Sequence, residues 1–137
     1  RAVCTAQTTN KIFDMVRAVT EKNQKRALDL YYDLLTLREP PMRILFLLAK
    51  QFRQICLTKK MSQEGLSQTE IASKLGVPSF VVRNLASCAR SYTVEELENA
   101  VRDFVDAEEA VKTGTLGDVL SVELLIVKYS SARAVRA

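Results

Sequence analysis

Apolar residues recur along the chain with the three- to four-residue spacing of amphipathic helices, and no stretch alternates for long enough to predict a strand. The prolines and glycines divide these patterns into seven expected helices. They begin near Thr9, Asn23, Pro41, Ser67, Pro78, Thr93 and Leu116. The sequence therefore predicts the all-α class, as a single compact helical bundle.

The helix that follows the proline pair at positions 40 and 41 is expected to be the central one, because it is apolar almost all round through Leu48. Helical spacing next to leucines favours a core position for Tyr31, Tyr32, Phe46 and Phe52, with a stacking platform for a ligand as the alternative. Val105 is expected on the inward, apolar side of the helix that begins near Thr93.

Three helix starts carry capping signals. Asn23 is a single N-cap, and the pairs Ser67 with Glu70 and Thr93 with Glu96 have the spacing of capping boxes. The chain before the first helix is different, because residues 1–8 show neither a helical nor a strand period. We interpret residues 1–8 as a linker from an upstream domain absent here, and residues 9–137 as one helical domain.

Residues 67–85, SQTEIASKLGVPSFVVRNL, have the spacing of a helix-turn-helix. Small Ala72 allows the two helices to approach each other, and Gly76 supplies the positive φ of the turn. A DNA reader needs polar side chains at the exposed start of the second helix, but this sequence has Phe80 and Val81 there. The pattern favours a packing motif or protein contact.

Arg83 and Asn84 keep open the alternative of a nucleic-acid-binding domain, in which they would make the contacts. Charge along the chain argues against it. Residues 1–65 hold 12 Lys and Arg against 6 Asp and Glu, whereas residues 66–137, with the motif, hold 8 against 10. Cations at helix ends, such as Lys22 and Lys59, are expected to complement helix C-termini.

Composition narrows the function further. The chain has 137 residues, of which 47% are hydrophobic and 26% charged, as in an ordinary soluble domain. It contains no histidine, which removes imidazole bases and metal ligands, and no phosphate-binding glycine loop. Cys4, Cys56 and Cys88 are too widely spaced for a metal site or disulfide framework, which favours a reducing cytoplasm. We predict no catalytic residue, cofactor, metal or membrane segment.

Several segments, in order and with matching gaps, resemble the C-terminal domain of the delta subunit of bacterial DNA polymerase III. They are IFDMVRAVTEKNQKRALDLYYDLL, LREPPMRILFLLAKQFRQI, GLSQTEIASKLGVPSFVVRN and YTVEELENAVRDFVDAEEAVKTG followed by VELLIVKY. The resemblance covers nearly everything from Thr9 to Tyr129. Its most specific parts are EPPMRILFLLAKQFR and LSQTEIASKLGVPSFVV.

The resemblance implies the helical collar domain of a clamp-loader subunit, which packs against the delta prime and tau/gamma subunits. It also implies that the sliding clamp and primed DNA are contacted only through the missing N-terminal part or the whole complex. This segment would then be no enzyme, although an upstream part could hold an active site. Apolar positions left over after each helix has one inward stripe predict the subunit interface: Phe80, Val81, Leu125 and Tyr129.

Overall fold

The structure is a computed structural model that describes residues 2–131, with side chains from Gln7 onward. Within that range it contains seven helices and no strand, which confirms the all-α class. The helices are α1 (Ala2–Thr20), α2 (Gln24–Thr36), α3 (Pro41–Gln63), α4 (Gln68–Leu75), α5 (Ser79–Ala89), α6 (Val94–Lys112) and α7 (Asp118–Ser130). No helix of this described part is long and apolar enough to cross a membrane.

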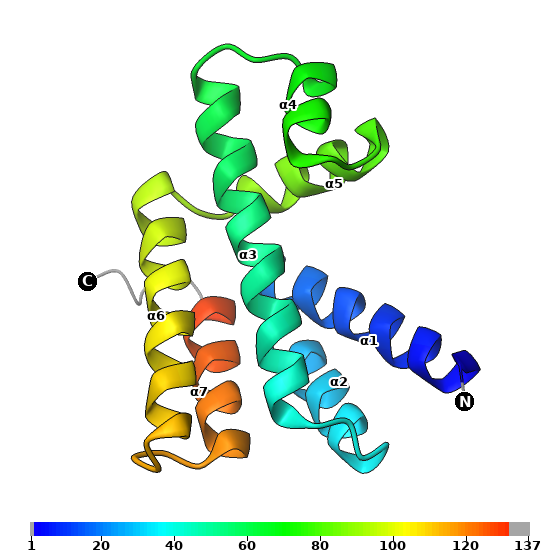
Figure 1. Cartoon of the computed structure of the whole chain (residues 1–137), viewed down its shortest axis with the longest axis vertical. Coiled ribbons are helices and arrows are strands. Elements are labelled where there is room, and N and C mark those ends of the chain that lie inside the picture. The colour runs from blue at the N-terminus through cyan, green and yellow to red at the C-terminus, as the bar shows by residue number, and fades with distance from the viewer. Residues whose placement is uncertain (1, 132–137) are drawn as a thin grey trace.

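Helix α3 is the longest and forms the axis of the bundle, as its apolar sequence predicts. Figure 1 shows α6 and α7 along one side of α3 and α1 and α2 on the other, while α4 and α5 sit near its C-terminal end. At the centre, the fully buried ring of Phe52 lies 5.3 to 5.9 Å, centroid to centroid, from the rings of Tyr92, Phe104 and Tyr129. Tilted aromatic pairs at such distances are favourable beyond the area they bury.

The three predicted capping arrangements are confirmed. The Asn23 side chain accepts a hydrogen bond from the backbone N–H of Arg26. In both capping boxes, the hydroxyl accepts from the backbone N–H three residues later and the glutamate accepts from the backbone N–H of the cap. These bonds satisfy amide donors that a helix leaves without intrahelical partners.

The connection between α4 and α5 also has the expected geometry. Gly76 has φ +72°, in the left-handed region, and its N–H bonds the carbonyl of Ala72. The two helices share a small core with the end of α3, separate from the main core. Its buried members are Ile71, Ala72 and Val82, and its half-buried members are Met61, Leu66, Leu75 and Val77.

The first helix corrects the prediction for the N-terminal residues. Helix α1 begins at Ala2, so residues 2–8 are helical, and the Thr8 side chain is buried. Adding residues to an existing helix is far easier than nucleating one, so a helix extends through a segment with no apolar period of its own. The link to an upstream domain stays a prediction, and the side chain of Cys4 lies outside the described residues.

Three side chains assigned to the core by their spacing are exposed instead. Phe46 is 66% and Val105 61% exposed, and Tyr32 is also at the surface, where its hydroxyl donates to Glu123 at 2.9 Å. In α3 the inward face is taken by Ile44 and Leu48, which leaves Phe46 on the outside. A helix that is apolar on more than one face does not reveal which face its neighbours cover.

Candidate subunit interface

A groove with a largely apolar lining is bounded by α1, α3 and α5. We call it the α1/α3/α5 groove, and its volume is about 470 Å³. Two partly exposed aromatic side chains line the groove: Phe13 of α1 is 43% exposed and Phe80 of α5 is 57% exposed. Its lining residues are Phe13, Val16, Arg17, Lys50, Gln51, Gln54, Val77, Phe80, Val81, Asn84, Leu85 and Cys88.

Local sequence explains why Phe80 is at the surface. The turn at Gly76 ends α4, and Pro78, in an extended conformation, leads directly into α5. Helix α5 buries Val82 and Leu85. Because a helix turns by about 100° per residue, Phe80 points to nearly the opposite side from Val82, two positions later. The ring is therefore held outside both cores by a well-defined helix start.

The charged side chains that line the α1/α3/α5 groove are all positive. Arg17 and Lys50 contribute the charged groups of its lining, and no Asp or Glu is among the lining residues. Neither cation takes part in any of the ion pairs found among the described residues. Polar amides of α3 and α5 complete the lining. The groove thus combines aromatic edges with positive charge that this part of the chain leaves unneutralised.

A smaller groove of about 210 Å³ lies on the α6 side of α3, and we call it the α3/α6 groove. The exposed side chains of Phe46 and Val105 stand at it, and Glu108 and Arg53 give it mixed charge. Lys50 lines both grooves. Exposed apolar side chains therefore flank α3 on two sides, with a lysine between them.

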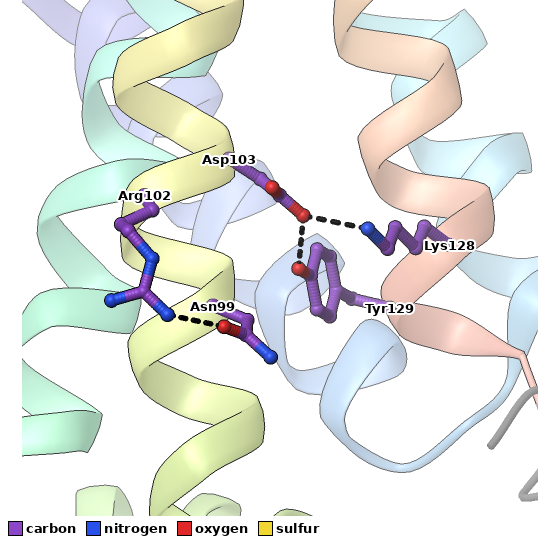
Figure 2. A network of polar contacts seen from close by, with 5 residues as sticks. All are labelled: Asn99, Arg102, Asp103, Lys128 and Tyr129. Carbon is purple, nitrogen blue, oxygen red and sulfur yellow. Dashed lines mark hydrogen bonds and ion pairs between the residues drawn. The ribbon is translucent and has the colours of Figure 1, made fainter.

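A polar network ties α6 to α7 beside the central rings (Figure 2). The Tyr129 hydroxyl donates to the Asp103 carboxylate, and the Lys128 ammonium lies 2.8 Å from the same oxygen. Partial burial would raise the pKa of Asp103, but the hydrogen bonds from Lys128 and Tyr129 outweigh it and leave the pKa below its usual value. The same network and burial raise the pKa of the Tyr129 phenol. This network fastens two helices together.

Known proteins match most of this chain. The sequence model of the family described as DNA polymerase III delta subunit, C-terminal domain, matches residues 9–129. The chain belongs to this family. The identification confirms the resemblance found in the sequence.

Two relatives of this delta C-terminal domain come from Bacillus subtilis. DNA polymerase III subunit delta of strain 168 is 32% identical over 117 residues, which are 85% of this chain. The solved DNA clamp loader delta protein superposes with a TM-score of 0.83 at 30% identity and covers 90% of this chain. The chain spans about a third of these relatives, 34% of the first and 36% of the second.

The structure separates the four predicted interface residues of this delta C-terminal domain into two groups. Phe80 is exposed and Val81 half-buried, and both line the α1/α3/α5 groove. Leu125 and Tyr129 were wrongly expected at the surface: they are only 8% and 6% exposed and belong to the main core.

The reason for this correction lies in which stripe of α7 faces the bundle. The buried stripe of α7 includes Val122, Leu125, Ile126 and Tyr129, and its exposed apolar residues are Val119, Leu120 and Leu124. Sequence reasoning also missed Phe13 at the surface. Adjacent residues of a helix can both be buried, as Leu125 and Ile126 are in α7, so its place next to Ile12 did not reveal its exposure.

The residues of the nucleic-acid alternative are both at the surface. Arg83 and Asn84 are exposed on α5, and Asn84 also lines the α1/α3/α5 groove. Two of the basic residues at helix ends complement helix C-termini, as predicted. Lys22 donates to the carbonyl of Tyr129 at 3.3 Å and Lys59 to that of Ala89 at 3.2 Å, each near a helix C-terminus.

The cysteines have the character of structural residues. Cys56 is buried, which raises the pKa of its thiol although Lys60 opposes the shift, and Cys88 is half-buried. Among the described residues, no group of three His, Cys, Asp or Glu side chains is placed to hold a metal ion. The side chains that line the two grooves offer apolar contact, hydrogen bonding and charge pairing.

Proposed function

We propose that this chain is a non-catalytic assembly domain of a cytoplasmic clamp loader. In this proposal it packs against other clamp-loader subunits, delta prime and tau/gamma, so that the complex can load the sliding clamp on primed DNA. Contacts with the clamp and the DNA belong to parts outside this chain or to the whole complex. Membership of the delta C-terminal family and the clamp-loader title of the solved relative support this role.

One observation carries the assembly role. Two large aromatic side chains, Phe13 and Phe80, remain on the surface, outside the main core around Phe52. They lie together at the α1/α3/α5 groove, which also holds further apolar side chains. Contiguous exposed apolar surface on a soluble domain is characteristic of a protein contact. Catalysis would need a set of titratable groups in a cleft, and neither groove gathers one.

Co-elution tests the proposal. This chain is mixed with the collar domains of delta prime and tau/gamma at concentrations well above micromolar and passed over a size-exclusion column. We expect it to move to the earlier-eluting peak of the complex, while the chain alone and the partners alone keep their own positions. Persistent separate elution at every ratio would contradict the assembly role.

The exposure of Arg83 and Asn84 side by side on α5 favours one second candidate, a nucleic-acid-binding domain. It predicts binding to duplex or primer-template DNA that weakens steeply with salt, because phosphate contacts release counterions. Titration of a labelled primer-template at low salt, with wild type and Arg83→Glu, decides the matter. Absence of binding by the wild type excludes this candidate and leaves the assembly role unaffected.

A further inference from the structure

We infer that the α1/α3/α5 groove receives an amphipathic helix of a partner subunit, with apolar side chains against Phe13 and Phe80 and carboxylates opposite Arg17 and Lys50. The inference rests on the proposed assembly role and adds to it the surface and the chemistry of the partner. Shape, charge and the contrast with the second groove each support it.

The shape of the groove suits a helix. Its walls come from three helices, and an additional helix packs best when its side chains enter the furrow between the side-chain ridges of its neighbours. Phe13 and Phe80 stand on different walls, and Val77 and Val81 give the groove further apolar surface. An apolar groove with aromatic edges is the usual receptor for the apolar face of an amphipathic helix. The two rings then act as anchors.

The positive charge of the groove indicates which residues should lie beside the apolar stripe of the partner helix. Arg17 and Lys50 lack carboxylate partners among the described residues, and the groove lining holds no Asp or Glu. A helix with acidic residues beside its apolar stripe would place negative charge against both cations. Such complementarity orients the partner and raises the rate of association more than it raises affinity. A basic partner helix would meet repulsion at both positions.

The α3/α6 groove differs in each respect. Its volume is less than half as large, and its lining holds a carboxylate, Glu108, as well as Lys50 and Arg53. Glu108 is itself paired with Lys112 at 3.3 Å. Charges of both signs line this groove, so they do not select one sign of charge in an occupant. Phe46 in that groove resembles Phe80 in chemistry and exposure, which makes it a matched control.

The test measures affinity for the mixture of delta prime and tau/gamma subunits, immobilised on a sensor surface. Phe13→Ser combined with Phe80→Ser should weaken binding by about thirtyfold, as expected when well-placed aromatic anchors are removed. Phe46→Ser should stay within about twofold of wild type. Since all these rings are exposed, thermal melts followed by circular dichroism should show that every variant is folded.

The charge arm uses Arg17→Glu, because Arg17 lines the α1/α3/α5 groove but not the α3/α6 groove, with Arg83→Glu as its control because Arg83 lines neither. Arg17→Glu should slow association about tenfold at low salt and lose most of that effect at high salt, where charges are screened. Arg83→Glu should change the association rate little. Arg17→Lys should bind like wild type.

The outcomes separate this inference from the assembly role. If wild type binds the subunits but the double serine variant binds as well, or Phe46→Ser weakens binding equally, the groove assignment is wrong and the assembly role stands. If wild type binds no subunit, both fail. Salt-sensitive DNA binding that is lost in Arg17→Glu would assign the groove to nucleic acid. Dimerisation of this chain alone that is lost in the double serine variant would assign the groove to a second copy of the chain. Each of these last two results would overturn the inference.

Discussion

The main core and the small core under α4 show two ways in which one chain stabilises helices. In the main core, rings from α3, α6, α7 and the segment before α6 meet around Phe52. The small core buries only Ile71, Ala72 and Val82. There, helix α4 depends on its capping box and on the left-handed turn at Gly76 as well as on burial. Where burial is scarce, local backbone signals carry a larger share of the stability.

Helix α5 belongs to both regions. Val82 enters the small core, whereas Leu85 and Ala89 enter the main core. The position of Phe80 at the surface is therefore set by two independent sets of contacts. This arrangement fits a helix that presents one aromatic side chain to a partner, because the ring is held in place before binding and less entropy is lost on association.

The largest contrast should come from deleting one ring at the centre. We expect Phe52→Ala to lower the free energy of unfolding by about 3–5 kcal/mol, through lost burial and the cavity that remains. Phe46→Ala, six positions earlier on the same helix but exposed, should change it by less than about 0.5 kcal/mol. Urea unfolding followed by circular dichroism measures both. Equal losses would mean that Phe46 is also part of the core.

Replacing one isoleucine by alanine in each core compares how strongly the two regions are stabilised by burial. Ile71→Ala should cost about 2 kcal/mol and Ile55→Ala more, since the small core has fewer fixed neighbours and can close around the gap. Ile71→Ala should also increase hydrogen exchange in α4 selectively, because a weakly buried segment opens without global unfolding. Hydrogen exchange measured on peptides of α4 and of α3 distinguishes local opening of α4 from global unfolding. Uniformly faster exchange would show that the cores unfold as one unit.

The two capping boxes provide a smaller and sharper test. Ser67→Ala and Thr93→Ala should each cost about 1 kcal/mol, because each leaves an amide at the start of its helix without its side-chain acceptor. We expect the Ser67 variant to loosen mainly α4 and the Thr93 variant to lower the global midpoint. Exchange and urea unfolding of both variants reveal this difference. A global loss from Ser67→Ala would contradict the local role of the α4 cap.

The smallest effect on the free energy of unfolding should come from Asp103, whose carboxylate links α6 to α7 beside the main core. Its pKa is lowered in the folded state, so its contribution is fully present well above the unfolded value of about 3.9 and is lost as the pH falls through the folded pKa. The difference in unfolding free energy between wild type and Asp103→Asn should therefore shrink from neutral pH to about pH 3. A constant difference across that range would mean that the charge of Asp103 is not involved.

Features that depend on neighbours in the sequence could be predicted without the structure. Capping boxes, the turn at Gly76 and the proline start of α3 are all local arrangements of backbone and side chain, and each occurs as expected. The exposure of Phe80 followed from the same local reasoning, since Val82 and Leu85 define the inner face of α5.

What the sequence determined by itself was the number, type and order of the helices, because capping groups and apolar periods act within a few residues. Tertiary structure decided which face of α7 is covered, and so placed Leu125 and Tyr129 inside and Leu124 outside. It also brought Phe13 and Phe80 to one groove, although 67 positions separate them. Burial depends on the neighbouring helices that pack against a residue, and a helix with apolar side chains on several faces can meet neighbours on any of them.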